Sequence, residues 1–193
     1  MTDNAISEQQ LIDSAVNGSS DAFGELVLLY EKKIYSFALG MLSDPDDAFD
    51  VSQDTFLKAY RSLSSFKGES SFYTWLYAIC RNCCYDYIKM RNRRMKKNVS
   101  LSEYENDDDG SVLEIPDTNS RPDVIFEQKQ ARELILEAVA SLPEKHREII
   151  VLRDFDDLSY EQIAQVLGIG EGTVKSRLSR ARARLQTLLA DKI

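Results

Sequence analysis

The sequence predicts an all-α protein made of two small helical domains joined by a flexible acidic linker, with a helix-turn-helix in the C-terminal domain. Apolar residues recur at spacings of three and four over most of the chain, and no segment shows the sustained alternation of a half-buried strand. Residues 98–126 lack this periodicity and combine two prolines and a glycine with a DDD run, which is typical of a flexible tether. We therefore expect domains at 1–97 and 127–193, with the linker at 98–126.

Length and composition are compatible with two compact cores. The chain has 193 residues, 43% of them hydrophobic, and a helical unit of well under a hundred residues can still bury about 60% of its unfolded surface. No apolar run approaches the roughly 18 to 20 residues of a membrane helix. The N-terminal stretch MTDNAISEQQ has neither the basic nor the apolar region of a signal peptide. We expect a cytoplasmic protein without membrane insertion.

The three cysteines lie together in the stretch CRNCCY. Their odd number and the absence of a distant partner speak against a disulfide framework. Cys80, Cys83 and Cys84 share one helical face, which allows core packing or metal ligation. Packing is favoured, because tetrahedral zinc needs a fourth ligand and the only histidine, His146, is far along the chain. We expect no metal and no cofactor, and we interpret His146 as a solvated helix residue.

The charge is arranged in blocks. The formal net charge of the whole chain is -8, yet five basic residues fall within 172–185. The net charge is -7 over 1–80, +6 over 81–97, -7 over 98–126 and 0 over 127–193. Such blocks suggest two contacts with nucleic acid and at least one surface for a positively charged partner.

The first helices are predicted from their caps and apolar stripes. Ser7 with Gln10 three residues later indicates a capping box. A core-facing stripe then defines a long helix through Phe23, Leu26, Val27, Tyr30, Ile34, Phe37, Ala38 and Met41.

Asp44 as N-cap and Pro45 at the first helical position begin the next helix. Its core side holds Ala48, Val51, Thr55 and Ala59. Asp47, Asp50 and Asp54 line up on another face, for which periodicity alone favours a solvated surface. A metal site there is poorly supported, because one helix face offers too few converging oxygens.

The stretch FKGESSFYTWLYAICRNCCYDYIKMRNRRMKK predicts a turn at Gly68 followed by a helix with a basic end. Its core stripe holds Phe72, Trp75, Leu76, Ile79, Cys80, Cys83 and Tyr87. Asn82 and Asp86 are neighbours on the other side. Aromatic, amide and basic groups on one element suit single-stranded DNA, although most of these aromatics, Trp75 included, are better explained as core.

The stretch LSYEQIAQVLGIGEGTVKSRLSRARARL predicts a helix-turn-helix. Ser159 and Gln162 form a capping box, Gly168 breaks the first helix, and the second begins near Glu171. The buried seam of the second helix is predicted at Val174, Leu178, Ala181, Leu185 and Leu188.

The opposite ridge of that helix consists mainly of small residues. It holds Gly172, Ser176, Ser179, Arg180 and Ala183, with Lys175 and Arg182 on one shoulder and Arg177 and Arg184 on the other. Such a ridge can approach the floor of the major groove while the shoulders reach the phosphates. A solvated basic face would usually interleave acids, and none follows Glu171 before Asp191. We therefore favour DNA binding.

Taken in order, four stretches resemble the extracytoplasmic-function sigma factors of bacterial RNA polymerase, especially the sigma-E-like branch. They are DAFGELVLLY, DDAFDVSQDTFLKAYRSLSSFKGESSFYTWLYAICRN, SLPEKHREIIVLRDFDDLSYEQIAQVLG and GTVKSRLSRARARL. The resemblance covers nearly the whole chain apart from the tether and the extreme ends.

The resemblance implies a role for each surface. The acidic stripe, as Asp47, Asp50, Gln53 and Asp54, matches the surface that grips the clamp helices of the largest polymerase subunit. The residues that would capture a flipped base of the minus-ten element are Phe66, Lys67, Gly68, Asn82 and Asp86. Those that would read the minus-thirty-five element are Lys175, Ser176, Ser179 and Arg180, with Arg177 and Arg182 beside them.

Further partners follow from the same resemblance. They are the flap of the second-largest subunit, promoter DNA and an anti-sigma factor, and the tether would thread the RNA path. The chain departs from the family at its three cysteines, where a redox response stays open, and at Ser179, where relatives often carry a larger side chain.

The predicted function is that of an alternative sigma factor that directs core RNA polymerase to promoters and assists melting without catalysis. The acidic N-terminal domain and tether would suppress DNA binding by the free protein. The main alternative is a dimeric helix-turn-helix regulator that binds duplex DNA without polymerase. A nuclease built on Asp47, Asp50 and Asp54 is a remote third possibility, because no phosphate loop, metal cluster or nucleophile arrangement accompanies them.

Overall fold

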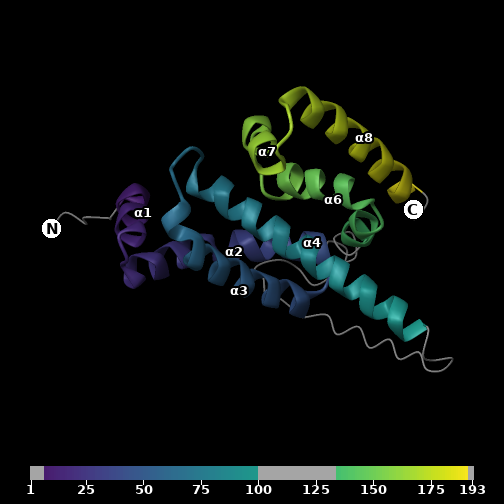
Figure 1. Ribbon diagram of the computed structural model, residues 1–193. Helices are drawn as coiled ribbons and strands as arrows, with labels where there is room; N and C mark the ends of the chain where they lie inside the picture. Colours follow the sequence, from purple (N-terminus) through teal and green to yellow (C-terminus); the bar gives the residue numbers. More distant parts are fainter. Residues whose placement is uncertain (1–6, 100–133, 191–193) are drawn as a thin grey trace, which may run out of the picture.

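The computed structural model describes residues 7–99 and 134–190, and the part of the chain that it describes is helical with no strand (Figure 1). The expected all-α fold is confirmed. The predicted linker at 98–126 lies outside the described residues except at its start, where the fourth helix continues to Val99. We call 7–99 the N-terminal lobe and 134–190 the C-terminal lobe.

The N-terminal lobe begins with three helices, of which the first and the third start with their predicted caps. Helix α1 (Glu8–Val16) starts with a capping box, in which the amide of Gln10 donates to Ser7 Oγ and the amide of Ser7 donates to Gln10 Oε1. Helix α2 (Ser20–Leu42) buries the predicted stripe, with Val27 only partly covered. Helix α3 (Pro45–Ser62) starts at Asp44, whose carboxylate accepts the amide of Asp47 at 2.8 Å.

Helices α2 and α3 form an antiparallel pair that closes on the long helix α4 (Phe72–Val99), after a short 3₁₀ turn η1 (Leu63–Ser65). The core side of α3 is the predicted one, with Ala48, Val51, Thr55 and Ala59 buried. Helix α4 buries Phe72, Leu76 and Tyr77, and the Tyr77 ring packs edge-on against Phe37 of α2 at 5.2 Å between centroids.

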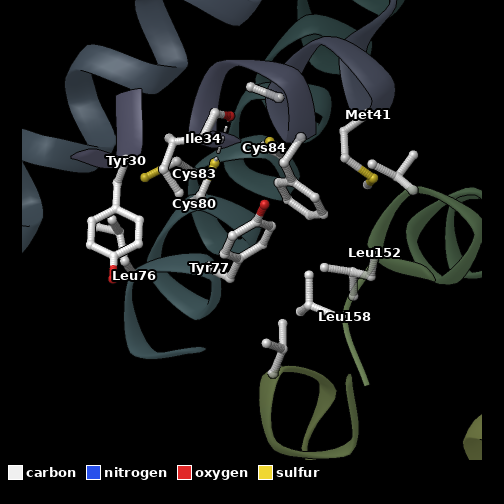
Figure 2. Close-up of a cluster of buried hydrophobic side chains, with 14 of the residues drawn as sticks. Tyr30, Ile34, Met41, Leu76, Tyr77, Cys80, Cys83, Cys84, Leu152 and Leu158 are labelled. Carbon is white, nitrogen blue, oxygen red and sulfur yellow. Dashed lines mark hydrogen bonds between the residues drawn. The ribbon is translucent and has the colours of Figure 1, made fainter. Parts of the chain in front are cut away.

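The cysteines belong to this core. Cys80, Cys83 and Cys84 are free thiols, all buried between α4 and its neighbours (Figure 2). Cys80 Sγ lies 3.9 Å from the carbonyl oxygen of Ile34 on α2. The interpretation of the cysteines as packing residues is confirmed.

The C-terminal lobe contains the expected helix-turn-helix. A helical stretch at 134–140 precedes α6 (Glu144–Ile150), a π-helical turn η2 (Val151–Phe155), α7 (Tyr160–Leu167) and α8 (Glu171–Ala190). Ser159 and Gln162 cap α7 reciprocally. Gly168 ends α7 in the left-handed region, with φ 64°, where a Cβ would be strained.

The two lobes pack against each other, which the sequence did not predict. Helix α7 packs against α4, and α6 and η2 pack against α2 (Figure 1). Leu152 and Leu158 face Tyr77, so one buried apolar cluster runs through both lobes (Figure 2). His146 corrects another expectation, because it is only half-exposed and its Nδ1 is buried rather than solvated. The packing of the lobes depends on contacts between residues distant in sequence, which periodicity does not encode.

Candidate nucleic-acid and polymerase interface

Helix α8 presents the predicted ridge to solvent. Val174, Leu178 and Ala181 are buried and Leu185 and Leu188 are partly covered, so the predicted seam is confirmed. The opposite side exposes Lys175, Ser176, Ser179 and Arg180, while Arg177 is half-buried. Ser176 Oγ donates to the carbonyl of Thr173 at 3.1 Å, which holds the hydroxyl close to the helix. An exposed ridge above a buried seam is the geometry that a major-groove helix needs.

One shoulder of α8 is already engaged within the lobe. Arg182 forms a two-point ion pair with Asp154 of η2, with Nε 3.1 Å from Oδ2 and the second nitrogen on Oδ1. This pairing raises the pKa of Arg182 further. Lys175 and Arg153 both lie over the ring of Tyr160, at 5.9 and 5.5 Å from its centroid. The sequence reasoning missed Asp154 and Tyr160, which no local spacing connects to α8.

A shallow groove runs along this side of the lobe. It is lined by Tyr160, Lys175, Leu178, Ser179, Arg182, Ala183 and Gln186. The predicted base-reading residues Lys175 and Ser179 and the ion-paired Arg182 therefore share one surface.

The predicted minus-ten residues are divided between a loop and one face of α4. Lys67 and Gly68 are exposed, and Gly68 has φ 71°, which a side chain at that position would disfavour. Phe66 is instead half-buried, because its ring packs against Phe72 and Trp75, 5.6 and 5.3 Å away.

Asn82 and Asp86 are exposed on α4, as their spacing predicts. At 100° per residue, Trp75, Lys89 and Arg93 fall on the same face of the helix as these two residues. Asp86, Lys89, Met90, Arg93 and Arg94 line a shallow depression there. This face therefore runs from an aromatic end through two polar groups to a basic end.

Helix α3 carries a surface that is both acidic and apolar. Asp50, Gln53 and Asp54 are exposed. Asp47 is not free, because its carboxylate accepts the hydroxyl of Tyr87 and lies 3.5 Å from an Arg91 nitrogen. The hydrogen bond to Asp47 raises the pKa of Tyr87 to about 12.

Three large apolar side chains beside these acids were missed by the sequence reasoning. Phe49, Leu57 and Tyr60 are 55%, 53% and 50% exposed. They lie next to Gln53 on the helical wheel, with Leu57 opposite the buried side of α3 and Phe49 and Tyr60 on its flank. The Tyr60 ring also packs against Phe23 of α2, 5.0 Å away. The predicted core side of α3 could have identified them. Once Ala48, Val51, Thr55 and Ala59 are taken as buried, residues elsewhere on the helical wheel must lie toward solvent.

Other chemistries find little support within residues 7–99 and 134–190. No three His, Cys, Asp or Glu side chains gather there as a metal site. No helix of the described part combines the length and hydropathy of a membrane span. Burial raises the pKa of Cys83, which keeps its thiol protonated and packed.

Comparisons with known proteins agree with this arrangement of surfaces. Residues 26–94 match the family model Sigma-70 region 2, and residues 132–185 match Sigma-70, region 4. The ECF RNA polymerase sigma-E factors of Escherichia coli K12 and Salmonella typhimurium LT2 are 38% identical over 92% of this chain and 91% of their own length. The Haemophilus influenzae sigma-E factor is 36% identical over 94% of both chains.

Two solved structures resemble the whole described arrangement. The sigma factor RpoE of Bartonella quintana, in complex with the anti-sigma factor NepR, has a TM-score of 0.68 and 32% identity over 87% of this chain and 96% of that chain. CnrH, in complex with the cytosolic domain of CnrY, has a TM-score of 0.70 and 25% identity over 96% of this chain and 99% of that chain.

Proposed function

This chain belongs to the extracytoplasmic-function (ECF) RNA polymerase sigma factors, and from that membership we propose how its described surfaces carry out transcription initiation. As an alternative sigma factor it binds core RNA polymerase, directs it to specific promoters and assists melting. The chain performs no catalysis itself, since the polymerase supplies the chemistry. It acts in the cytoplasm as an N-terminal domain at 1–97, a linker at 98–126 and a C-terminal domain at 127–193.

The exposed ridge of α8 is the observation that carries the proposal. Lys175, Ser176, Ser179 and Arg180 read the minus-thirty-five element in the major groove, and Arg177 and Arg182 support them from the shoulders. The short side chains of Ser176 and Ser179 let the backbone of α8 come close to the base edges. Lysine and arginine are therefore the residues that reach base edges and phosphates.

The polar face of α4, with the preceding loop, captures the melted strand of the minus-ten element. Extruding a base from the stack costs a few kcal/mol, so the receiving surface must offset part of that cost. Asn82 and Asp86 offer hydrogen bonds to a base edge, and Lys67 and Gly68 border the capturing loop. Phe66 acts from its packed position beneath that loop.

The mixed surface of α3 binds the clamp helices of the largest polymerase subunit. Asp50, Gln53 and Asp54 provide charge and hydrogen bonds, while Phe49 and Leu57 provide apolar area that the binding partner covers. Asp47 contributes by fixing α3 against α4 through Tyr87. The C-terminal lobe contacts the flap of the second-largest subunit.

An anti-sigma factor controls the chain. This part of the proposal is supported by the likeness to RpoE and CnrH, which were solved with NepR and with the cytosolic domain of CnrY. An anti-sigma factor that covers both lobes would block DNA and polymerase at once.

The test compares duplex binding by the free chain and by the chain with core polymerase. We expect weak binding of labelled promoter DNA by the free chain, tight binding with core enzyme, and loss of the latter in Lys175→Ala/Arg180→Ala. Phe49→Ala/Leu57→Ala should weaken core binding by tenfold or more, since central interface residues often contribute about 1 kcal/mol or more each. Val16→Ala, an exposed apolar residue on α1, is the matched control. Nanomolar duplex binding by a dimer without polymerase would instead establish the dimeric regulator.

A further inference from the structure

Arg182 is held in one orientation by the C-terminal lobe itself. Its Nε lies 3.1 Å from Oδ2 of Asp154, and its Nη2 donates to Oδ1 of the same carboxylate. Asp154 belongs to η2, whereas Arg182 lies in the middle of α8. Parallel hydrogen bonds of this kind fix the plane of a guanidinium and not only its position.

The turn that carries Asp154 is closed by its own hydrogen bonds. The amide of Leu158 donates to the carbonyl of Leu152 at 3.0 Å. The carbonyl of Leu158 in turn accepts a hydrogen bond from Arg153 Nη1 at 2.8 Å. These bonds hold the backbone around Asp154, so its carboxylate is a fixed support for Arg182.

Stability does not explain this ion pair. The side chains of Arg182 and Asp154 are 51% and 31% exposed. Ion pairs with such exposure typically contribute little to folding, because water screens the charges and ordering the side chains costs entropy. What the pair does fix is the direction in which the guanidinium points. A positioning role is therefore better supported than a stabilising one.

The pairing leaves one edge of the Arg182 guanidinium free. A guanidinium is a planar fork of N–H donors. Asp154 accepts from Nε and Nη2, which form one edge of that fork. Within residues 7–99 and 134–190, Nη1 has no hydrogen-bond partner. Nη1 and the second N–H of Nη2 can therefore donate to acceptors that lie side by side.

Arg182 lines the groove along α8, where a large partner can reach it. The floor of the groove includes the small side chains of Ser179 and Ala183, and Lys175 and Gln186 border it. Ser179 and Ala183 lie one turn apart and are neighbours on the helix. Small neighbours let a partner come close to the backbone. Helix α8 lies on the outer side of the C-terminal lobe, so this groove is accessible (Figure 1).

The charge around Arg182 favours a neutral acceptor over a phosphate. The carboxylate of Asp154 lies against the guanidinium and would repel a phosphate oxygen brought to the free edge. A base edge carries no net charge, so the geometry of the fork decides that contact. In the major groove, guanine presents O6 and N7 as adjacent acceptors, whereas adenine places a donor beside its N7. The free edge of Arg182 therefore matches guanine.

We propose that Arg182 reads a guanine of the minus-thirty-five element through O6 and N7, and that Asp154 is the positioning residue that directs the free edge of the guanidinium to that base. This assignment rests on the proposed function, in which α8 enters the major groove. Because Asp154 orders the side chain before DNA arrives, less side-chain freedom is lost on binding. Arg182 thus contributes selectivity for one base pair rather than attraction to phosphates.

The first test selects DNA sequences with the polymerase complex. Core polymerase carrying the wild-type chain or a variant binds a promoter library in which the minus-thirty-five element is randomised, and the bound DNA is sequenced. Arg182→Ala should remove a guanine preference of about 5- to 150-fold at one position, which is the discrimination expected of a bidentate contact. The preferences at the other positions should remain.

A second pair of variants separates positioning from contact. Asp154→Asn keeps Arg182 but weakens its support, because an amide offers one oxygen acceptor where a carboxylate offers both. It should lose much of the guanine preference while binding to all sequences tightens. Asp157→Asn is the matched control. It removes the same charge from an exposed side chain just beyond η2, at a φ of 54° that asparagine tolerates, and should keep the guanine preference.

A modified base identifies the acceptor on the DNA. Replacing the selected guanine by 7-deazaguanine removes N7 and leaves the base pair intact. Binding by the wild-type complex should weaken, whereas binding by the Arg182→Ala complex should not change. The difference between the two complexes isolates the hydrogen bond from Arg182 to N7.

The same base preferences in wild type and Arg182→Ala would overturn the assignment. So would a uniform loss of affinity for every sequence in Arg182→Ala, which is the mark of a phosphate contact. Equal guanine preference in Asp154→Asn and Asp157→Asn would remove the positioning role of Asp154. All of these results leave the proposed function standing. A wild-type complex that selects no upstream sequence would instead refute the proposed function, and this assignment with it.

Discussion

The two arginines at positions 180 and 182 should differ in how much they contribute to the salt dependence of DNA binding. Both lie on α8, but Arg182 is paired with Asp154 whereas Arg180 is exposed and, within the described residues, has no ion pair. Each phosphate neutralised contributes a slope of about -0.9 to log K against log salt. Because the charge of Arg182 is already balanced by Asp154, its contact with DNA should release few counterions from the phosphates.

Arg180→Ala should make the slope of log K against log salt shallower by about 0.9. Between 50 and 200 mM salt, the variant should therefore lose about 3.5-fold less affinity than the wild type. Arg182→Ala should change the slope by less than half as much. Asp154→Asn, which releases Arg182, should make the slope steeper. Binding of labelled promoter DNA by the polymerase complex across this salt range measures all three, and contacts made by the polymerase cancel in the differences. Equal slopes for Arg180→Ala and Arg182→Ala would show that the ion pair with Asp154 does not reduce the contribution of Arg182 to phosphate binding.

Three further predictions concern Asp156, the cysteines and the cap of α3. Burial, and to a lesser extent the neighbouring Asp157, raises the pKa of Asp156 from 3.8 to about 7, although the Tyr77 hydroxyl and Lys33 act in the opposite direction. The folded chain therefore binds a proton that the unfolded chain releases between those values. The free energy of unfolding, measured with urea, should fall as pH rises from about 4 to 7 and this contribution should level off above it, and Asp156→Asn should flatten that part of the curve. The pKa of Cys84 is raised by the neighbouring Cys80 thiol and by burial, so a thiol reagent should find almost no reactive cysteine in the native chain and all three after denaturation. Asp44→Ala should lower the free energy of unfolding by about 1 kcal/mol and the melting temperature by about 2–4 °C. Asp46→Ala, in the same first turn of α3, should have a smaller effect, and equal losses of stability in the two variants would contradict the capping role of Asp44.

Features encoded within one helical turn could be predicted from the sequence. The capping boxes at Ser7 and Ser159 and the buried seam of α8 depend on spacings of three and four residues, and the structure confirms them. The Asn82 and Asp86 face of α4 was predictable for the same reason, because two residues four apart must be neighbours on a helix.

Features that join distant parts of the chain could not be predicted. Arg81 meets Glu148 across 67 positions and Arg147 meets Met41 across 106, so no spacing indicates either pair. The hydrogen bond from Tyr87 to Asp47, which is predicted as a polymerase contact, likewise joins residues 40 positions apart and is not indicated by any spacing. Gly40 resembles any other small residue in an apolar helix when only the sequence is considered. The structure shows that a Cβ at this position would lie 2.8 Å from a methyl carbon of Val151.

This chain gives core RNA polymerase its promoter specificity. The direct test is run-off transcription over a genomic library, with and without the chain, followed by sequencing of the RNA 5′ ends. We expect new start sites that share two upstream motifs and that disappear with Lys175→Ala/Arg180→Ala. Unchanged start sites on adding the chain, from a polymerase preparation that responds to another sigma factor, would contradict it.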